Sequence, residues 1–231
     1  VLQVDISEIR AEAVRLDGQS IPELSYTLFS IYSRTGSRLE YERVYFERRR
    51  RLNTYVFLAL VEPDHPEVLE KLEDILWAIC DEYTWCLPAH LPADHNAADI
   101  NRYIDLFSSE TGFTLSEVLL LLGERLSQLL RSRIHHEVER RLFRPFLENG
   151  PYDWETARHN WAAVCAGSIG AAALLSVEDP AMLADILLRT ERAMLYYLEG
   201  FGEDGACLEG LGYWNYGFGY FTYYSDLLCS R

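Results

Sequence analysis

Apolar residues recur along most of this chain at the three- and four-residue spacing of an α-helix. The clearest case runs from Glu67 to Tyr83, where one helical stripe carries Leu69, Leu72, Ile75, Leu76 and Ile79. No segment shows the strict alternation of apolar and polar residues that is typical of a half-buried strand. The sequence therefore predicts an all-α fold, built from antiparallel helical pairs joined by short turns.

Further helices are expected on both sides of this segment. We predict them at 39–60, 97–110, 115–130, 133–147 and 180–200, with a last one beyond Tyr216. Thr114 and Glu117 have the spacing of a capping box, so the helix at 115–130 should begin there. Gly112 should close the helix before it.

Two aspartates are the expected N-caps of later helices. Asp153 should begin the helix that carries His159, and Asp179 should begin the next one, with Pro180 at its first position. The first of these helices contains AGSIGAAALL, at residues 166–175, which is rich in small side chains. We expect a neighbouring helix to pack closely against this run.

The composition limits the classes of partner. A chain of 231 residues with 49% hydrophobic residues can bury a substantial core, so a single domain over residues 1–231 is expected. Its apolar runs are too short to cross a bilayer, and no membrane partner is expected. The formal net charge of −15 argues against nucleic acid as a partner, because such binding needs Lys and Arg to neutralise phosphates. The densest basic zone is interpreted as a solvated helix face: Arg131, Arg133, Arg140, Arg141 and Arg144.

The cysteines and histidines indicate no metal site. Five cysteines, at positions 80, 86, 165, 207 and 229, are widely spaced and contain no CxxC, which favours free thiols. Free thiols favour a cytoplasmic location, with a secreted or periplasmic parent protein as the alternative, and the first residues do not resemble a signal peptide. His135, His136 and Glu137 lack the i, i+4 histidine pair of a zincin helix. We expect neither a metal nor a cofactor.

The run from Glu203 to Tyr220, EDGACLEGLGYWNYGFGY, is unusually rich in glycine and aromatic residues. Glycines let a backbone approach a ligand closely. Aromatic rings and phenolic hydroxyls are groups on which sugars stack and which can transfer protons. The alternative interpretation is a joint between two helices, with the aromatic residues filling the interior.

Three runs, in order, resemble one known family. They are WCLPAHL at 85–91, HNWAAVCAG at 159–167 and DGACLEGLGYWNYG at 204–217. Together they resemble the heparinase II/III-like polysaccharide lyases at their α/α-toroid domain, over roughly residues 40 to 230. The resemblance implies an incomplete α/α toroid of antiparallel helical hairpins. Family members carry a β-sandwich region after the toroid, so the chain is expected to be the N-terminal portion of a longer lyase, inactive alone.

The resemblance also implies a reaction, β-elimination across a uronic acid glycosidic bond in an acidic polysaccharide or oligosaccharide. A base removes the C5 proton, and the C4 oxygen leaves with a proton. Asn160, with His159 beside it, matches the motif position that neutralises the uronate carboxylate. Tyr213 matches the tyrosine that serves as acid and often as base, with Tyr216 as its competitor. Family lyases use a further catalytic histidine, to which no residue of this chain can be matched.

Other residues of the three runs are candidates for sugar contacts: Trp85, His90, Trp161, Glu209 and Trp214. For Glu209 the alternative is a carboxylate that satisfies backbone N–H groups at a helix start, and for Asn160 it is a helix cap or a buried amide. Trp85 and His90 lie on a predicted loop, where an exposed Trp would form a sugar platform, or else cap a helix pair. Two other functions stay open. One is a glycoside hydrolase, for which Asp204 and Glu209 are the local carboxylate pair. The other is a non-catalytic carbohydrate-binding module.

Overall fold

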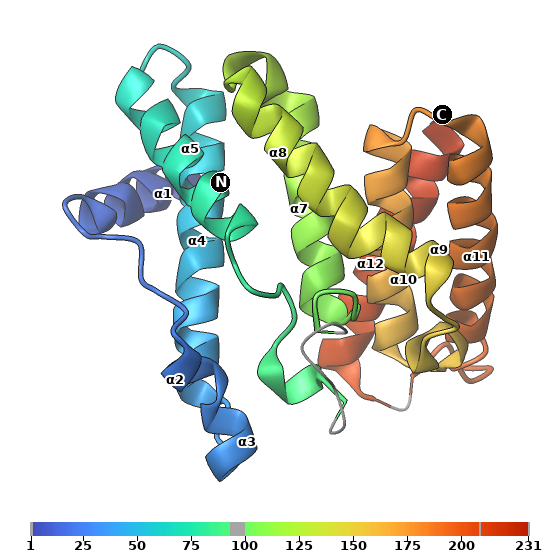
Figure 1. Cartoon of the computed structure of the whole chain (residues 1–231). Helices are drawn as coiled ribbons and strands as arrows, with labels where there is room; N and C mark the ends of the chain where they lie inside the picture. Colours follow the sequence, from blue (N-terminus) through green and yellow to red (C-terminus); the bar gives the residue numbers. More distant parts are fainter. Residues whose placement is uncertain (1, 93–99, 208, 231) are drawn as a thin grey trace. The chain divides into compact units, whose positions relative to one another are not determined.

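The computed structural model describes residues 2–92, 100–207 and 209–230, with the side chains of residues 2–5 excluded. Helices dominate these ranges, and none of the described residues belongs to a β-strand (Figure 1). The one β-type pairing within them is an isolated bridge between Phe201 and Cys207, which closes a loop. The prediction of an all-α fold is confirmed for the part of the chain that the structure describes.

The chain divides into two compact units. The first comprises Val1–Tyr83, Leu87–Ala89 and Leu121–Ile134, and the second comprises Thr84–Cys86, His90–Leu120 and His135–Arg231. Two boundaries fall inside helices α7 and α8, so each of these helices contributes residues to both units. The single domain expected over the whole chain stays a prediction.

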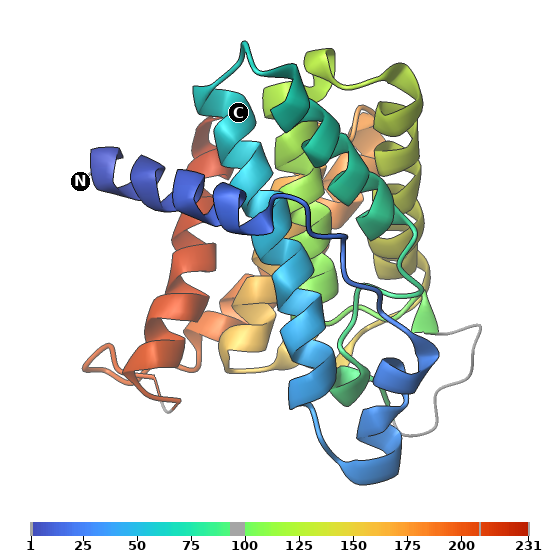
Figure 2. The same ribbon diagram turned by 90° about the vertical axis from the view of Figure 1, so that its left-hand side faces the viewer.

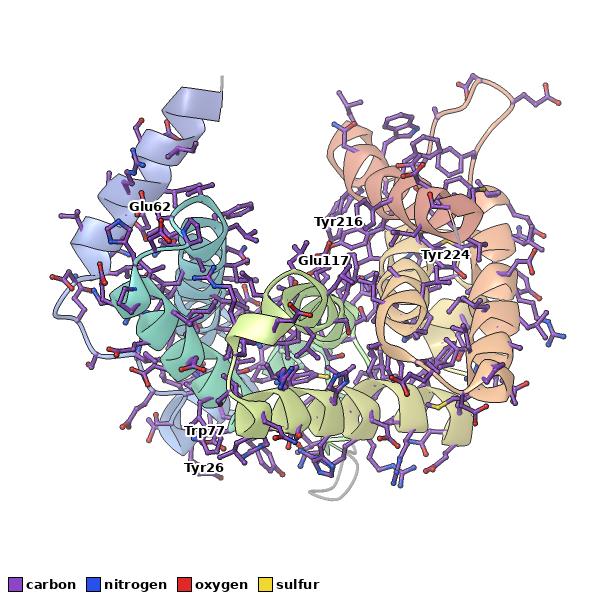
Figure 3. All side chains as sticks on the ribbon, turned by 90° about the horizontal axis from the view of Figure 1, so that it is seen from above. Tyr26, Glu62, Trp77, Glu117, Tyr216 and Tyr224 are labelled. Atoms are coloured by element: carbon purple, nitrogen blue, oxygen red, sulfur yellow. The ribbon has the colours of Figure 1, made fainter. Side chains whose placement is uncertain are left out.

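The first unit is built on a helical hairpin. Its helices are α1 (Leu2–Leu16), α2 (Tyr26–Phe29), α3 (Ile31–Thr35), α4 (Leu39–Val61) and α5 (Pro66–Cys80), followed by a 3-10 turn, η2 (Gly123–Arg125). α4 and α5 pack together, and α1 lies against α4 (Figure 2). The predicted stripe of α5 forms the core, because Leu72, Ile75 and Ile79 are fully buried. At the C-terminal end of α4, Arg10 of α1 donates to Glu62 at 2.6 Å. Glu62 is labelled in Figure 3.

The second unit contains the three helices that the candidate site needs. Its elements are α7 (Leu106–Leu122), α8 (Gln128–Val138), the π-helical turn η3 (Glu139–Phe143), α9 (Arg144–Glu148), η4 (Asp153–Thr156), α10 (Asn160–Ser176), α11 (Pro180–Leu198) and α12 (Leu211–Ser230); the 3-10 turn η1 (Pro88–His90) ends in this unit. α10 is the central helix, and both α11 and α12 pack on it. It is buried along nearly its whole length.

Small residues of α10 bring α12 into close contact, as predicted. A Cβ atom on Gly170 would lie 2.4 Å from the ring of Tyr224, and one on Gly167 would lie 3.1 Å from the carbonyl oxygen of Tyr220. The residue numbers rise together along the two helices, so α10 and α12 run in parallel. Since α11 connects them, it runs antiparallel to both.

The helix boundaries around residue 114 differ from the prediction. α7 runs from Leu106 to Leu122 without a break, so neither the stop at Gly112 nor the capping box of Thr114 and Glu117 exists. Instead, Asp105 starts the helix, because its Oδ1 accepts from the backbone N–H of Ser108 at 2.7 Å. Gly112 lies inside α7, where its Cβ position is 2.6 Å from Leu142. Part of the helix predicted at 97–110 lies outside the described residues.

Other predicted helix starts are confirmed in one case and wrong in two. Asp179 caps α11, accepting from the N–H of Ala181 at 2.9 Å, with Pro180 at the first position. Asp153 begins the short turn η4, whereas His159 is the N-cap of α10. The last helix was predicted beyond Tyr216, but α12 begins at Leu211. Its first half therefore contains the aromatic residues from Tyr213 to Tyr220.

The remaining expectations concern thiols and charges. All five cysteines belong to the described residues, and the structure has them as free thiols, as predicted. The predicted solvated basic face is wrong for Arg141, which is 5% exposed and pairs with Glu137 at 2.6 Å. Within the described ranges, no helix is long and apolar enough to span a bilayer.

Candidate functional site

The HNW and DGACLEG runs meet at the start of α10. The carboxylate of Glu209 accepts two hydrogen bonds from Asn160, one from the backbone N–H to Oε2 and one from Nδ2 to Oε1, each at 2.6 Å. The first N–H groups of a helix have no partner within the helix, and the helix dipole makes this end attractive to an anion. The sequence folds in this way because Glu209 brings a carboxylate to an end that needs one.

Asn160 is 3% exposed, and its Oδ1 atom is buried without a hydrogen-bond partner among the described residues. The amide is therefore held on one side only, by Glu209. Its access to a ligand depends on Glu209, which covers its two donors.

His159 is exposed and stands immediately before the first turn of α10. Its backbone is extended, with φ −143° and ψ 176°, and its Nδ1 accepts from the N–H of Trp161 at 3.4 Å. An imidazole that accepts at Nδ1 carries its proton on Nε2 when it is neutral. The exposed histidine can thus offer an N–H donor beside Asn160.

His90 and Trp161, both predicted to contact sugar, lie together. Their ring centroids are 4.9 Å apart, and His90 also stacks on Phe107 with an interplanar angle of 14°. The Nδ1 of His90 is 2.8 Å from Oδ2 of Asp105, the same aspartate that starts α7. A carboxylate in this position fixes the orientation of the imidazole. The ring of His90 that contacts Trp161 at the start of α10 is therefore held in one orientation.

Tyr213 lies in the first turn of α12, four positions after Glu209, and is 55% exposed. It makes no hydrogen bond to another described residue. Trp214 is engaged locally, because its indole N–H donates to the carbonyl of Gly205 at 3.1 Å and its ring stacks on Phe218 with centroids 4.9 Å apart. Of the two, only Tyr213 has a side-chain polar group without a hydrogen-bond partner among the described residues.

Tyr216 belongs to a different cluster, on the side of α12 that faces α7 (Figure 3). Its hydroxyl donates to Oε1 of Glu110 at 2.7 Å, and the hydroxyl of Tyr220 donates to the same oxygen at 2.6 Å. Burial raises the pKa of Glu110 above its ordinary value, against the lowering effect of the two tyrosines. Burial and the adjacent carboxylate raise the pKa values of both tyrosines well above their usual range.

A second carboxyl–phenol pair lies further along the same helices. Tyr223 donates to Oε1 of Glu117 at 2.8 Å, and burial, followed by this carboxyl, raises the pKa of Tyr223 to about 12. Neither Glu110 nor Glu117 is among the site residues predicted from the sequence, where Glu117 appears only in the capping-box prediction. A signal for them exists, because they are the only charged residues in α7 and their seven-residue spacing places them on one helical face.

Trp85 does not serve as a sugar platform, since it is only 1% exposed. The guanidinium carbon of Arg141 lies 4.9 Å from its ring centroid. The alternative noted from the sequence, a Trp that caps a helix pair, agrees with this burial. The prediction of an exposed Trp85 was wrong because the nearby prolines, Pro88 and Pro92, predict a loop but do not predict whether a side chain on that loop is exposed.

The structure thus brings together most, but not all, of the candidate residues. Asn160, Glu209, His159, Trp161 and His90 lie around the start of α10, and Tyr213 and Trp214 lie in the first turn of α12. Tyr216 points to Glu110, and Trp85 is buried elsewhere in the unit. Over the described part of the chain, no three His, Cys, Asp or Glu side chains are grouped so as to hold a metal ion.

No model of a known protein family matches this sequence. A search among curated proteins also finds no match.

Proposed function

We propose that this chain is the helical part of a polysaccharide lyase that cleaves uronic acid-containing glycans by β-elimination. The proposal is carried by one observation, the carboxylate of Glu209 held by two N–H donors of Asn160 at 2.6 Å. A uronate carboxylate is the same chemical group. The same helix start and amide would therefore hold the substrate carboxylate once it takes the place of Glu209.

In this proposal Asn160 and His159 make the C5 proton acidic. Hydrogen bonds to the uronate carboxylate stabilise the negative charge that develops when the adjacent proton leaves. Asn160 supplies donors fixed by the helix, and His159 supplies the N–H of Nε2 from an exposed position. A neutral histidine is sufficient for this role, because it acts as a hydrogen-bond donor.

Tyr213 is the proposed acid for the C4 oxygen and the first choice for the base. It lies four positions from Glu209 and is 55% exposed. Tyr216 is a poorer choice, because its hydroxyl already donates a hydrogen bond to the shared oxygen of Glu110 and its raised pKa disfavours the phenolate. Trp161 and His90 would pack against the sugar beside the scissile bond.

We further propose that the second unit is part of an α/α toroid. In such a fold, inner helices run in one direction and outer helices return between them. The parallel α10 and α12, joined through the antiparallel α11, support this arrangement. Under this proposal α10 and α12 are inner helices, and their N-terminal ends border the substrate.

The decisive experiment measures the products formed when the full-length protein is incubated with heparan sulfate, alginate and related uronate polymers. A lyase produces an unsaturated uronate, which absorbs in the ultraviolet. New reducing ends without this absorbance would identify a hydrolase, for which Asp204 and Glu209 are the local carboxylates. Binding with no turnover in any arm would identify a carbohydrate-binding module. Either result contradicts the lyase proposal.

A further inference from the structure

A cavity of about 410 Å³ lies in the second unit, at the C-terminal end of α10. Residues of α7, α8, η3, the link between α10 and α11, and the first turn of α11 form its wall. Its volume is within the range of small-molecule sites. The candidate lyase site lies at the other end of the same helix, roughly 24 Å away at a rise of 1.5 Å per residue.

Part of the wall is apolar. Val138 and Phe143, which line the cavity from α8 and η3, are buried. Leu119, Val177 and Met182 line it from α7, from the link after α10 and from α11, and each is half-buried. An apolar group that enters the cavity removes its own surface and part of these side chains from water. The cavity therefore favours a ligand with an apolar body.

The serine and backbone groups of the wall are hydrogen-bond acceptors. The hydroxyl of Ser116 donates its hydrogen to the carbonyl oxygen of Gly112 at 2.9 Å, and the hydroxyl of Ser176 donates to that of Ala172 at 2.7 Å. Each hydroxyl oxygen can then only accept. Ser176 is also the last residue of α10. The carbonyl groups at such an end have no partner within the helix and form the negative end of its dipole.

The charged groups of the wall are mainly carboxylates: Glu139, Glu178 and Asp179. Glu139 pairs with Arg144 at 2.7 Å, so these two charges cancel. Asp179 caps α11, and Glu178 is exposed without an ion pair to any part of the chain that the structure describes. The one basic side chain of the wall is His135. Even if His135 is protonated, three negative charges stand against two positive ones, so the cavity carries a net negative charge.

We propose that this cavity binds a small primary amine with an apolar body. An ammonium group has three donors and no acceptor, so it matches both the acceptors and the negative charge of the wall. Glu178 supplies the ion pair, and the apolar body lies against Phe143 and Met182. The site does not depend on the proposed lyase function, because it uses none of the residues around the start of α10.

The test is calorimetry of the full chain, at constant ionic strength, with three probes that share one apolar body: 2-phenylethylamine, 2-phenylethanol and 3-phenylpropionate. We expect saturable binding of the amine, at least about tenfold tighter than binding of the alcohol, and weaker binding still of the carboxylate. Methylamine, which lacks the apolar body, should bind at least about tenfold more weakly than 2-phenylethylamine. No saturable binding of 2-phenylethylamine, or equal affinity for this amine and either 2-phenylethanol or methylamine, would overturn the proposal.

Two charge reversals place the amine in this cavity. Glu178→Lys should weaken binding of 2-phenylethylamine by about tenfold or more, because it puts a positive charge beside the ammonium group. The matched control is Glu191→Lys, at an exposed position of α11 that does not line the cavity, and it should change the affinity by less than about twofold. Met182→Ala should weaken binding of both the amine and 2-phenylethanol by about twofold to fivefold. Equal losses in Glu178→Lys and Glu191→Lys, or no loss in Glu178→Lys, would overturn the proposal.

Discussion

Asn160 and Glu209 are joined by two hydrogen bonds of 2.6 Å, although 49 positions separate them in the sequence. The pair connects the first turn of α10 with the segment that leads into α12. It therefore contributes both to stability and to the placement of Tyr213, which follows Glu209 by four positions.

Replacing Glu209 by Gln should destabilise the chain. One oxygen that accepts from Asn160 becomes an NH2 group, which faces a donor, and losing a charge-assisted hydrogen bond costs about 1–3 kcal/mol. Urea unfolding measures the loss, and a double-mutant cycle with Asn160→Ala should give a coupling of about 0.5–3 kcal/mol. The control is Glu203→Gln, an exposed carboxylate in the same run. Equal effects of the two Glu→Gln changes would contradict the prediction.

Removal of the two tyrosine hydroxyls should affect turnover unequally. Tyr213→Phe should lower kcat/KM by about 10²–10⁴-fold if its hydroxyl transfers a proton. Tyr216→Phe should lower it by less than about tenfold, because its hydroxyl already donates to Glu110. Initial rates on a uronate polymer that the wild-type protein cleaves test this prediction. A larger loss of kcat/KM in Tyr216→Phe than in Tyr213→Phe would assign proton transfer to Tyr216.

The carboxyl of Glu110 should make stability depend on pH. Because burial raises its pKa in the folded protein, its contribution is fully present below its ordinary value of 4.5 and is lost as the pH rises through the folded pKa. Glu110→Gln has no such titration, so its unfolding free energy relative to wild type should increase as the pH rises from about 4.5. Chemical unfolding across a pH series measures this difference. A difference between the two proteins that stays constant across the pH series would contradict this prediction.

Two glycines provide a test of the contact between α10 and α12. Gly170→Ala should destabilise the protein by about 1–3 kcal/mol, because the new Cβ would lie 2.4 Å from the ring of Tyr224, whose hydroxyl bonds to Thr190. Gly219→Ala, in α12 with no atom within 4 Å of the new Cβ, should be neutral or stabilising by up to about 1 kcal/mol. Thermal unfolding compares them. A neutral Gly170→Ala would show that the two helices can separate at little cost.

Helix periodicity and an N-cap with proline were sufficient to predict α4, α5 and α11, because these helices each bury one stripe and end at clear breaks. The capping-box spacing of Thr114 and Glu117 gave a wrong helix start, because this motif stabilises only the first turn of a helix and Thr114 lies inside α7. Inside α7 the backbone keeps its helical hydrogen bonds, and the close contact between Gly112 and Leu142 keeps this turn packed.

The candidate site was predictable only in part. The local runs identified Asn160, Glu209 and Tyr213, and the alternative interpretation of Glu209, a carboxylate that accepts from helix-start N–H groups, agrees with its bond to the N–H of Asn160. No pattern indicated which helix start this carboxylate would reach. Glu110 was missed because its partners, Tyr216 and Tyr220, are 106 and 110 positions away. Local sequence contains no information about contacts over such separations, and the contact between Trp85 and Arg141 likewise joins residues that are far apart in the chain.

The choice of His159 as the cap of α10 leaves the first turn of this helix unevenly held. The N–H of Trp161 reaches only the exposed imidazole, at 3.4 Å, whereas the N–H of Asn160 reaches the carboxylate of Glu209, at 2.6 Å. Opening of this turn should therefore begin at Trp161, and faster hydrogen exchange at its amide than at the Asn160 amide would report it.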